Sequence, residues 1–203
     1  MEEKIVFSSD GLEMEGLFAR GTTDSAVVVT HPHPLYGGDM LNPVVEAVAR
    51  AYAGAGFTTL RFNFRGTGAS RGTFDNGVGE RDDVLAAQDF LRSQGSGPVD
   101  LAGYSFGAWV NALSCRDRPA TGRMVMVAPP VNFLDFGPVA SLPALGLVIA
   151  GDRDEFGSTD RIRAMVPDWN AGAAFDVIPG ADHFFWGHLD RVEEIIADFL
   201  RRP

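Results

Sequence analysis

Short apolar runs alternate along the chain with longer segments that are apolar on one side only. Runs of this length, bounded by polar residues and glycines, predict strands that are buried on both faces. The segments between them have apolar residues at helical spacing and predict helices. The predicted strands are residues 26–30, 57–62, 99–102, 124–128, 145–150 and 174–178. The predicted helices are residues 43–52, 79–91, 108–116, 158–166 and 189–200.

The order of these elements predicts the fold class. Residues 4–8 and 12–20 predict an antiparallel pair joined at Asp10-Gly11, a common hairpin turn. After this pair, strand and helix alternate, which favours a mostly parallel, eight-stranded sheet with helices on both faces. No linker or repeat interrupts the pattern, so we expect residues 1–203 to form one α/β domain.

Composition narrows the classes of partner. The 203 residues are 45% hydrophobic and carry a net charge of −10 without a long basic stripe, so we expect no nucleic-acid partner. Cys115 is the only cysteine, which excludes an intrachain disulfide and a cysteine-based zinc site, and we expect it to be buried. The N-terminus resembles no signal region, and no apolar run could span a bilayer. We therefore expect a cytoplasmic protein without a membrane partner; the oligomeric state stays open.

The segment Gly103-Tyr104-Ser105-Phe106-Gly107 lies between a predicted strand and a predicted helix. A serine flanked by glycines two residues away on each side is typical of a nucleophile elbow, a sharp turn that exposes the serine hydroxyl. The turn strains the serine backbone and brings neighbouring elements too close for side chains at the glycine positions. The pattern predicts Ser105 as a nucleophile.

A serine hydroxyl needs a base and an oriented acid, and both types of residue follow later predicted strands. Ligand and catalytic groups gather at the carboxyl ends of parallel strands. His183 follows the last predicted strand and is favoured as the base over His188, which lies near the start of the last helix. Asp154 is favoured as the acid over Asp152, which we expect to hold its own loop. The order Ser, Asp, His is that of an α/β-hydrolase.

The oxyanion that forms during acyl transfer needs backbone N–H donors. We expect one donor from Phe106, the residue after the nucleophile. The other should come from the loop after residues 26–30, where Pro32 and Pro34 have no N–H, which leaves Leu35 first and Tyr36 second.

Three further residues near these loops have a structural and a functional interpretation. His31 and His33 point to opposite sides of an extended segment, so we favour structural roles over a metal site and expect no metal. The glycine-rich segment that starts at Arg65 lacks a nucleotide-binding motif. We favour Arg65 as a residue that holds this loop over a substrate contact.

Several motifs together identify a family resemblance. The segments HPHPLYGG (31–38), FNFRGTGASRGTFDNGVGE (62–80) and GYSFG (103–107), with GDRDEF and GADHFFWG further on, resemble a group of small bacterial hydrolases without a lid. This group belongs to the α/β-hydrolase superfamily, which the chain resembles over almost its entire length. The resemblance implies a triad of Ser105, Asp154 and His183 and implies the chemistry better than the substrate.

The stretch 129–143, where many α/β-hydrolases insert a lid, is too short for a cap domain. We therefore expect an open pocket lined by aromatic side chains. The candidates are Tyr36, Phe133, Phe136, Phe156, Phe184 and Trp186. The predicted function is a serine hydrolase that cleaves small to medium acyl esters or thioesters without a cofactor. A peptidase of the same fold and a ligand-binding module without activity are the alternatives.

Overall fold

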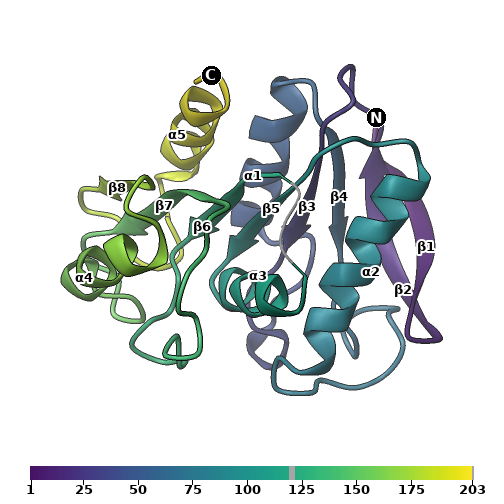
Figure 1. Ribbon diagram of the computed structural model, residues 1–203, viewed down its shortest axis with the longest axis horizontal. Coiled ribbons are helices and arrows are strands. Elements are labelled where there is room, and N and C mark those ends of the chain that lie inside the picture. Colours follow the sequence, from purple (N-terminus) through teal and green to yellow (C-terminus); the bar gives the residue numbers. More distant parts are fainter. Residues whose placement is uncertain (119–121, 203) are drawn as a thin grey trace.

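The computed structural model describes residues 1–118 and 122–202, which form one eight-stranded sheet with helices on both faces (Figure 1). The strand order is β1-β2-β4-β3-β5-β6-β7-β8. The strands are β1 (Glu3–Ser9), β2 (Leu12–Ala19), β3 (Ala26–Thr30), β4 (Thr58–Phe62), β5 (Val99–Tyr104), β6 (Met124–Val127), β7 (Leu145–Gly151) and β8 (Ala174–Ile178). The helices are η1 (Pro34–Tyr36), α1 (Pro43–Gly54), α2 (Gly79–Ser93), α3 (Phe106–Asp117), α4 (Thr159–Asn170) and α5 (Leu189–Leu200).

The pairing of the strands confirms the predicted sheet. β1 pairs antiparallel with β2 around the Asp10-Gly11 turn, and β2 pairs antiparallel with β4. All other neighbours, from β4 to β8, are parallel. The parallel strands therefore end at a common edge, which lies at the bottom of Figure 1 for β3, β4 and β5.

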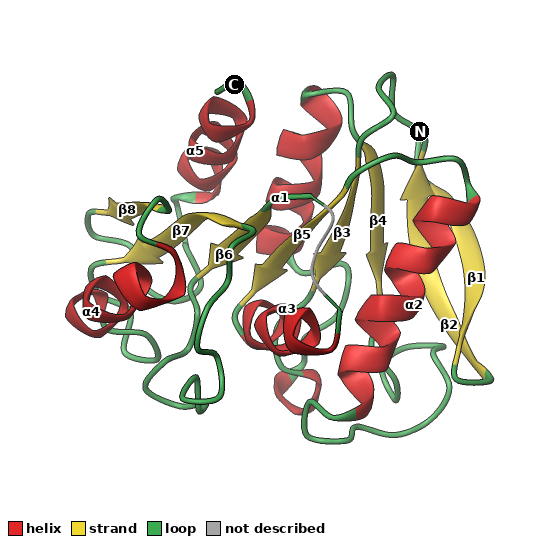
Figure 2. Cartoon of the chain, in the orientation of Figure 1, coloured by secondary structure: helices red, strands yellow, loops and turns green. Residues whose placement is uncertain are grey.

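The core is divided by the sheet into two layers (Figure 2). Along β3, Ala26 and Val28 face one layer, and Val27 and Val29 face the other, because successive strand residues point to opposite sides. α2, α3 and α4 cover the first layer, and α1 and α5 pack side by side over the second. Burial on both faces explains why the first four residues of β3, Ala26 to Val29, are all apolar. Cys115 is only partly buried against the first layer.

Two elements differ from the expected ones. α4 continues through Pro167 to Asn170, although the sequence predicted an end at 166. Its last turn is held by Trp169, which is buried, packs on Phe136 with ring centroids 5.3 Å apart and accepts a hydrogen bond from the Leu142 N–H. This packing outweighs the backbone hydrogen bond that proline cannot donate. The η1 turn, a single turn of 3-10 helix in the segment after β3, was not predicted from the sequence.

No helix interrupts residues 128–144 between β6 and β7, all of which the structure describes. The expectation of a fold without a cap at this position is therefore met, and the carboxyl edge of the sheet stays uncovered there.

Candidate active site

Ser105 occupies a strained turn between β5 and α3. Its backbone has φ of 54° and ψ of −118°, a left-handed conformation that costs a non-glycine residue free energy. A Cβ on Gly103 would lie 2.5 Å from the Ala108 nitrogen, and one on Gly107 would lie 2.6 Å from the Thr30 oxygen. Both positions therefore require glycine. The cause is the close approach of neighbouring elements, as predicted from the glycines on each side of Ser105.

Three polar side chains from different loops lie in line at the carboxyl edge. His183 Nε2 lies 2.9 Å from Ser105 Oγ, and His183 Nδ1 lies 2.8 Å from Asp154 Oδ2. The carboxylate accepts the Nδ1–H, so the neutral ring presents Nε2 as an acceptor for the serine hydroxyl. Asp154 is itself held by the N–H groups of Phe156 and Gly157, which donate to Oδ1. All three side chains are buried.

Tyr104 fixes the loop that carries His183. Its hydroxyl donates to the His183 carbonyl at 3.0 Å, and its ring lies 5.6 Å from the imidazole. Burial raises the pKa of the Tyr104 phenol, so it stays protonated and remains a donor. Tyr104 was not among the functional residues predicted from the sequence, although its position beside Ser105 was the available signal.

The two rival residues have structural roles in these loops. Asp152 Oδ1 accepts the Gly180 N–H at 2.7 Å, so it joins the loops after β7 and β8, whereas the sequence had led us to expect bonds within its own loop. His188 occupies the N-cap position of α5, where the sequence had placed it, and its side chain makes no capping hydrogen bond. Neither residue contacts Ser105.

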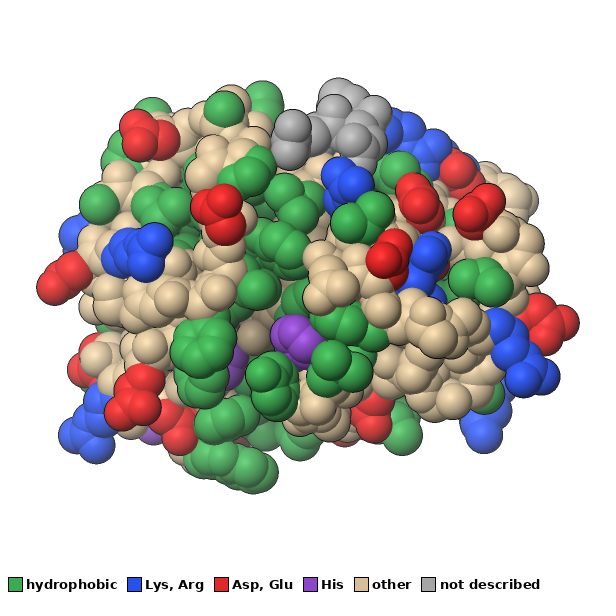
Figure 3. Space-filling view, turned by 90° about the horizontal axis from the view of Figure 1, so that it is seen from below, with side chains coloured by type: hydrophobic (Ala, Val, Ile, Leu, Met, Phe, Trp, Pro, Cys, Tyr) green, Lys and Arg blue, Asp and Glu red, His purple; other side chains and the backbone are tan. Residues whose placement is uncertain are grey.

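A cavity of about 570 Å³ opens beside Ser105. Figure 3 views this edge of the molecule and shows hydrophobic side chains gathered around a histidine. Four of the aromatic residues expected at the pocket line it: Tyr36, Phe133, Phe156 and Phe184. Among the described residues, those that line the cavity include no Asp, Glu, Lys or Arg.

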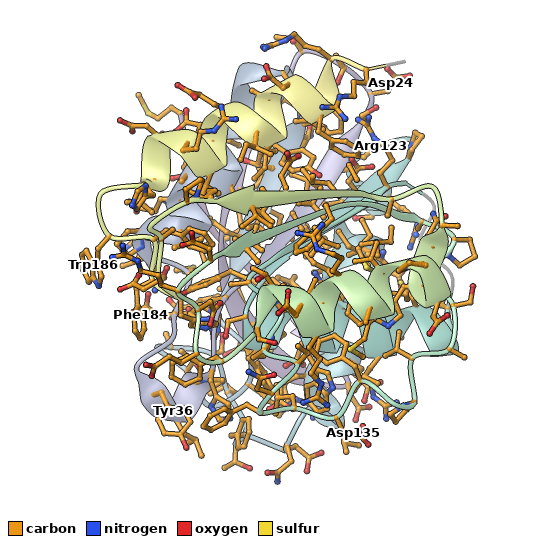
Figure 4. The ribbon with its side chains drawn as sticks, turned by 90° about the vertical axis from the view of Figure 1, so that its left-hand side faces the viewer. Asp24, Tyr36, Arg123, Asp135, Phe184 and Trp186 are labelled. Atoms are coloured by element: carbon orange, nitrogen blue, oxygen red, sulfur yellow. The ribbon has the colours of Figure 1, made fainter. Side chains whose placement is uncertain are left out.

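Two of the expected pocket residues do not line this cavity. Phe136 is 2% exposed and packs in the core against Trp169, because the loop after β6 turns inward at this residue. Trp186 is 70% exposed and points into solvent at the margin of the molecule (Figure 4). A position in a loop near the candidate site did not distinguish inward-facing from outward-facing rings.

The expected N–H donor at Leu35 is already engaged. η1 makes the His33 side chain its N-cap, and the Leu35 N–H donates to His33 Nδ1 at 3.2 Å. The second choice, Tyr36, donates its N–H to the His33 carbonyl at 3.1 Å. The prediction for Leu35 is therefore corrected: a 3-10 turn uses these N–H groups locally.

His31 lies under the site and has the structural role that the sequence favoured. It is fully buried, its Nδ1 lies 2.6 Å from the Pro32 carbonyl, and Nε2 accepts the Phe64 N–H at 3.0 Å. Nδ1 therefore carries the proton. Burial lowers the pKa of His31 to about 4, because a charged ring would lose its water and Nε2 would lose its lone pair.

Acid should therefore destabilise the fold through His31. The unfolded ring binds a proton near its ordinary pKa of 6.5, whereas the folded ring binds it only near 4. The contribution is fully present above pH 6.5 and is lost as the pH falls towards 4, to a total of about 3 kcal/mol. The glutamine in His31→Gln cannot titrate. We therefore expect the free energy of unfolding in urea to fall by about 3 kcal/mol less in this variant than in wild type between pH 6.5 and 4. Parallel pH profiles for the two proteins would contradict this expectation.

Arg65 holds the glycine-rich loop, as the sequence favoured. Its Nη2 lies 2.8 Å from Asp83 Oδ1, and its backbone N–H donates to Asp83 Oδ2. Asp83 is fully buried and also accepts the Ser9 hydroxyl at 2.7 Å. The guanidinium is thus committed to a buried ion pair that ties the loop to α2 and β1.

Residues 1–118 and 122–202 contain no cluster of three or more His, Cys, Asp or Glu side chains that could hold a metal ion. None of the helices in this part of the chain combines the length and the apolar character needed to cross a membrane.

An α/β sheet that carries a serine on a strained strand-to-helix turn is the architecture of the α/β hydrolases. The profile described as "Alpha/beta hydrolase family" matches residues 27–168. The chain therefore belongs to the α/β hydrolase family, and the predicted fold class is confirmed.

Relatives with similar sequences match nearly the whole chain. An uncharacterised protein of Rickettsia prowazekii (strain Madrid E) is 36% identical over 209 residues, which cover 97% of this chain and 88% of the relative. An alpha-beta serine hydrolase homologue from Coxiella burnetii is 34% identical, with a TM-score of 0.90 over 97% of this chain and 96% of the other. A serine hydrolase without a lid from Xanthomonas campestris is 29% identical, with a TM-score of 0.91 over 99% of this chain and 94% of the other. These relatives support a hydrolase; the narrower motif-defined group stays a prediction.

Proposed function

We propose that the protein is a serine esterase that hydrolyses uncharged acyl esters of small to medium size through an acyl-enzyme. The observation that carries this proposal is the continuous line of hydrogen bonds from Asp154 through His183 to Ser105. No cofactor takes part in the proposed reaction.

In the proposed mechanism, Ser105 Oγ attacks the acyl carbon while His183 Nε2 takes the hydroxyl proton. Asp154 holds the imidazole tautomer and stabilises the imidazolium that forms. His183 then gives the proton to the leaving alcohol as its bond to the acyl carbon breaks. A water molecule, deprotonated by the same nitrogen, attacks the acyl-enzyme and releases the acid and Ser105.

For the oxyanion we propose the N–H groups of Phe106 and His33. Phe106 begins α3, so its N–H has no acceptor inside the helix and lies at the positive end of the helix dipole. The His33 N–H has no acceptor in the described part of the chain. His33 lines the cavity, and its ring lies 4.8 Å from that of Phe106, which supports a shared site.

Removing the His33 N–H should therefore slow the chemical step. His33 has φ of −59°, which proline can adopt without strain. We expect His33→Pro to lower kcat about 10²- to 10³-fold relative to His33→Ala, which lacks the same side chain but keeps the N–H. The ratio of kcat values for p-nitrophenyl butyrate measures this effect, and equal kcat values would exclude the His33 N–H as a donor.

The absence of charge on the described cavity wall supports esters over the other candidates. A peptidase that selects a free terminus needs a charged partner for an ammonium or a carboxylate, and the cavity residues offer none. A thioester whose carrier bears phosphate groups would find no Lys or Arg partner for those phosphates among the cavity residues. An apolar wall with few polar groups suits a neutral ester instead.

The test combines turnover with labelling of the nucleophile. Wild type and Ser105→Ala are assayed with p-nitrophenyl acetate, p-nitrophenyl butyrate and an aminoacyl nitroanilide, and both are treated with a fluorophosphonate probe. We expect ester hydrolysis and labelling that both require Ser105. A ligand-binding module would show neither, and a peptidase would prefer the nitroanilide.

A further inference from the structure

Two groups of rings meet at the cavity, one that includes Phe106 and one that contacts His183, and all of their members except Phe74 line it. On one side, the His33 ring lies 4.8 Å from Phe106, 4.8 Å from Tyr36 and 4.9 Å from Phe74. We call these four residues the His33 group. They come from the segment after β3, the glycine-rich loop and the start of α3.

On the other side, the Phe156 ring lies 4.6 Å from His183, 5.1 Å from Phe133 and 6.3 Å from Phe184. Phe133, Phe156 and Phe184 form what we call the Phe156 group. In the described part of the chain, no ring contact joins this group to the His33 group. Figure 4 labels one member of each, Tyr36 and Phe184, along the same margin of the molecule.

The two sides differ in polarity. The Leu35 N–H donates to His33 Nδ1, so the neutral ring carries its proton on Nε2. That Nε2–H has no acceptor among the described residues. Burial lowers the pKa of His33 and keeps the ring neutral. Asn42 also lines the cavity, and its oxygen is used by the Val44 N–H, which leaves its amide hydrogens to donate.

The Phe156 side has no such donors. Besides the Phe156 group, Pro130 and Leu134 line the cavity, and none of these side chains can form a hydrogen bond. A polar group placed there would lose its water without a replacement partner.

We propose, building on the esterase function above, that the cavity takes its ester in one orientation, with the acyl group against the His33 group and an apolar leaving group against the Phe156 group. The orientation follows from the chemistry of His183, which must reach the leaving oxygen to protonate it. Phe156 and Phe184 contact His183, so the remainder of the leaving group extends over them. The substrate class is an ester of an apolar, preferably aromatic, alcohol whose acyl chain carries an oxygen acceptor for the His33 Nε2–H.

The acyl side is tested with p-nitrophenyl butyrate and p-nitrophenyl methoxyacetate, whose acyl chains differ only at one position, where butyrate has CH2 and methoxyacetate has an oxygen. His33→Asn keeps an acceptor for the Leu35 N–H but has no donor at the position of Nε2. His33→Gln keeps a donor at that position but not the acceptor. We expect His33→Asn to lower the methoxyacetate-to-butyrate ratio of kcat/KM about 3- to 10-fold against wild type, the range of one neutral hydrogen bond. His33→Gln should lower the ratio much less.

An unchanged ratio in His33→Asn, or an equal fall in both variants, would overturn the role of the Nε2–H. An equal fall would trace the effect to the cap on Leu35 instead. Because each variant is compared with wild type on the same two esters, their different intrinsic reactivities cancel.

The leaving-group side is tested with a crossed pair of exposed residues. Phe133 is 68% exposed and Tyr36 is 82% exposed, so neither alanine variant removes core packing. We expect Phe133→Ala to lower the ratio of kcat/KM for p-nitrophenyl butyrate over ethyl butyrate several-fold and to leave the acyl preference unchanged. We expect Tyr36→Ala to lower the ratio of kcat/KM for p-nitrophenyl hexanoate over p-nitrophenyl acetate and to leave the leaving-group preference unchanged. The reverse pattern, or no pattern, would overturn the orientation.

These results separate the two proposals. If no ester is hydrolysed in a Ser105-dependent manner, the esterase function and the orientation both fail. If hydrolysis depends on Ser105 but the ratios do not respond as described, the esterase function stands and only the orientation fails.

Discussion

Replacing Ser105 with alanine is expected to lower kcat for p-nitrophenyl butyrate by about 10⁴- to 10⁶-fold. In the proposed mechanism the Ser105 hydroxyl oxygen attacks the acyl carbon, and without it only the oxyanion donors and substrate binding would assist attack by water. Alanine tolerates the turn no worse than serine, because both have a Cβ and the strain lies in φ of 54°. The measurement is steady-state kinetics on purified proteins, with circular dichroism to compare folding.

His183→Ala should have an effect of the same size, and the double variant should be no slower than either single one. The reason is that the hydroxyl and its base, 2.9 Å apart, act as one unit. The control is His188→Ala, since His188 begins α5 and does not contact Ser105. Additive losses in the double variant, or a comparable loss in the control, would contradict the assignment of His183 as the base.

The second large effect is expected from Asp154→Asn, which should lower kcat about 10³- to 10⁴-fold. Asp154 Oδ2 accepts the Nδ1–H of His183 at 2.8 Å and so leaves Nε2 free to take the serine proton. An asparagine amide facing Nδ1 would donate to it and favour the opposite tautomer, with the proton on Nε2. Attack by Ser105 would then lack a base.

Asp152→Asn is the matched control, because it removes a charge from the same loop. Asp152 accepts the Gly180 N–H at 2.7 Å, and an amide oxygen can accept it as well. We expect this variant to retain nearly all activity at the same pH. If Asp152→Asn lost as much activity as Asp154→Asn, the loop rather than the carboxylate of Asp154 would be responsible.

The sequence predicted the sheet well because its patterns are local. A continuous apolar run such as Ala26 to Val29 in β3 indicates a strand that is covered on both faces, and the glycines around Ser105 indicate the close approach of Ala108 and Thr30. The Asn42-Pro43 start of α1 is equally local, because the Asn42 side chain accepts the Val44 N–H at 2.9 Å. Where a long-range contact competes with a local signal, as at Pro167 and Trp169 in α4, the prediction from sequence was wrong.

By itself, the sequence determined the strands and the five α-helices, their order and the three residues that the site brings together, because each of these follows from residue types at short spacing; η1 and the end of α4 did not follow from it. Tertiary structure decided which N–H groups and which rings are free to meet a substrate. Leu35 was excluded as a donor by a 3-10 turn whose cap is the His33 side chain. Phe136 turned into the core and Trp186 into solvent, whereas Phe133 and Phe156 line the cavity. The physical reason is that hydrogen-bond partners and side-chain direction in a loop depend on what packs against it, and residue spacing does not encode those neighbours.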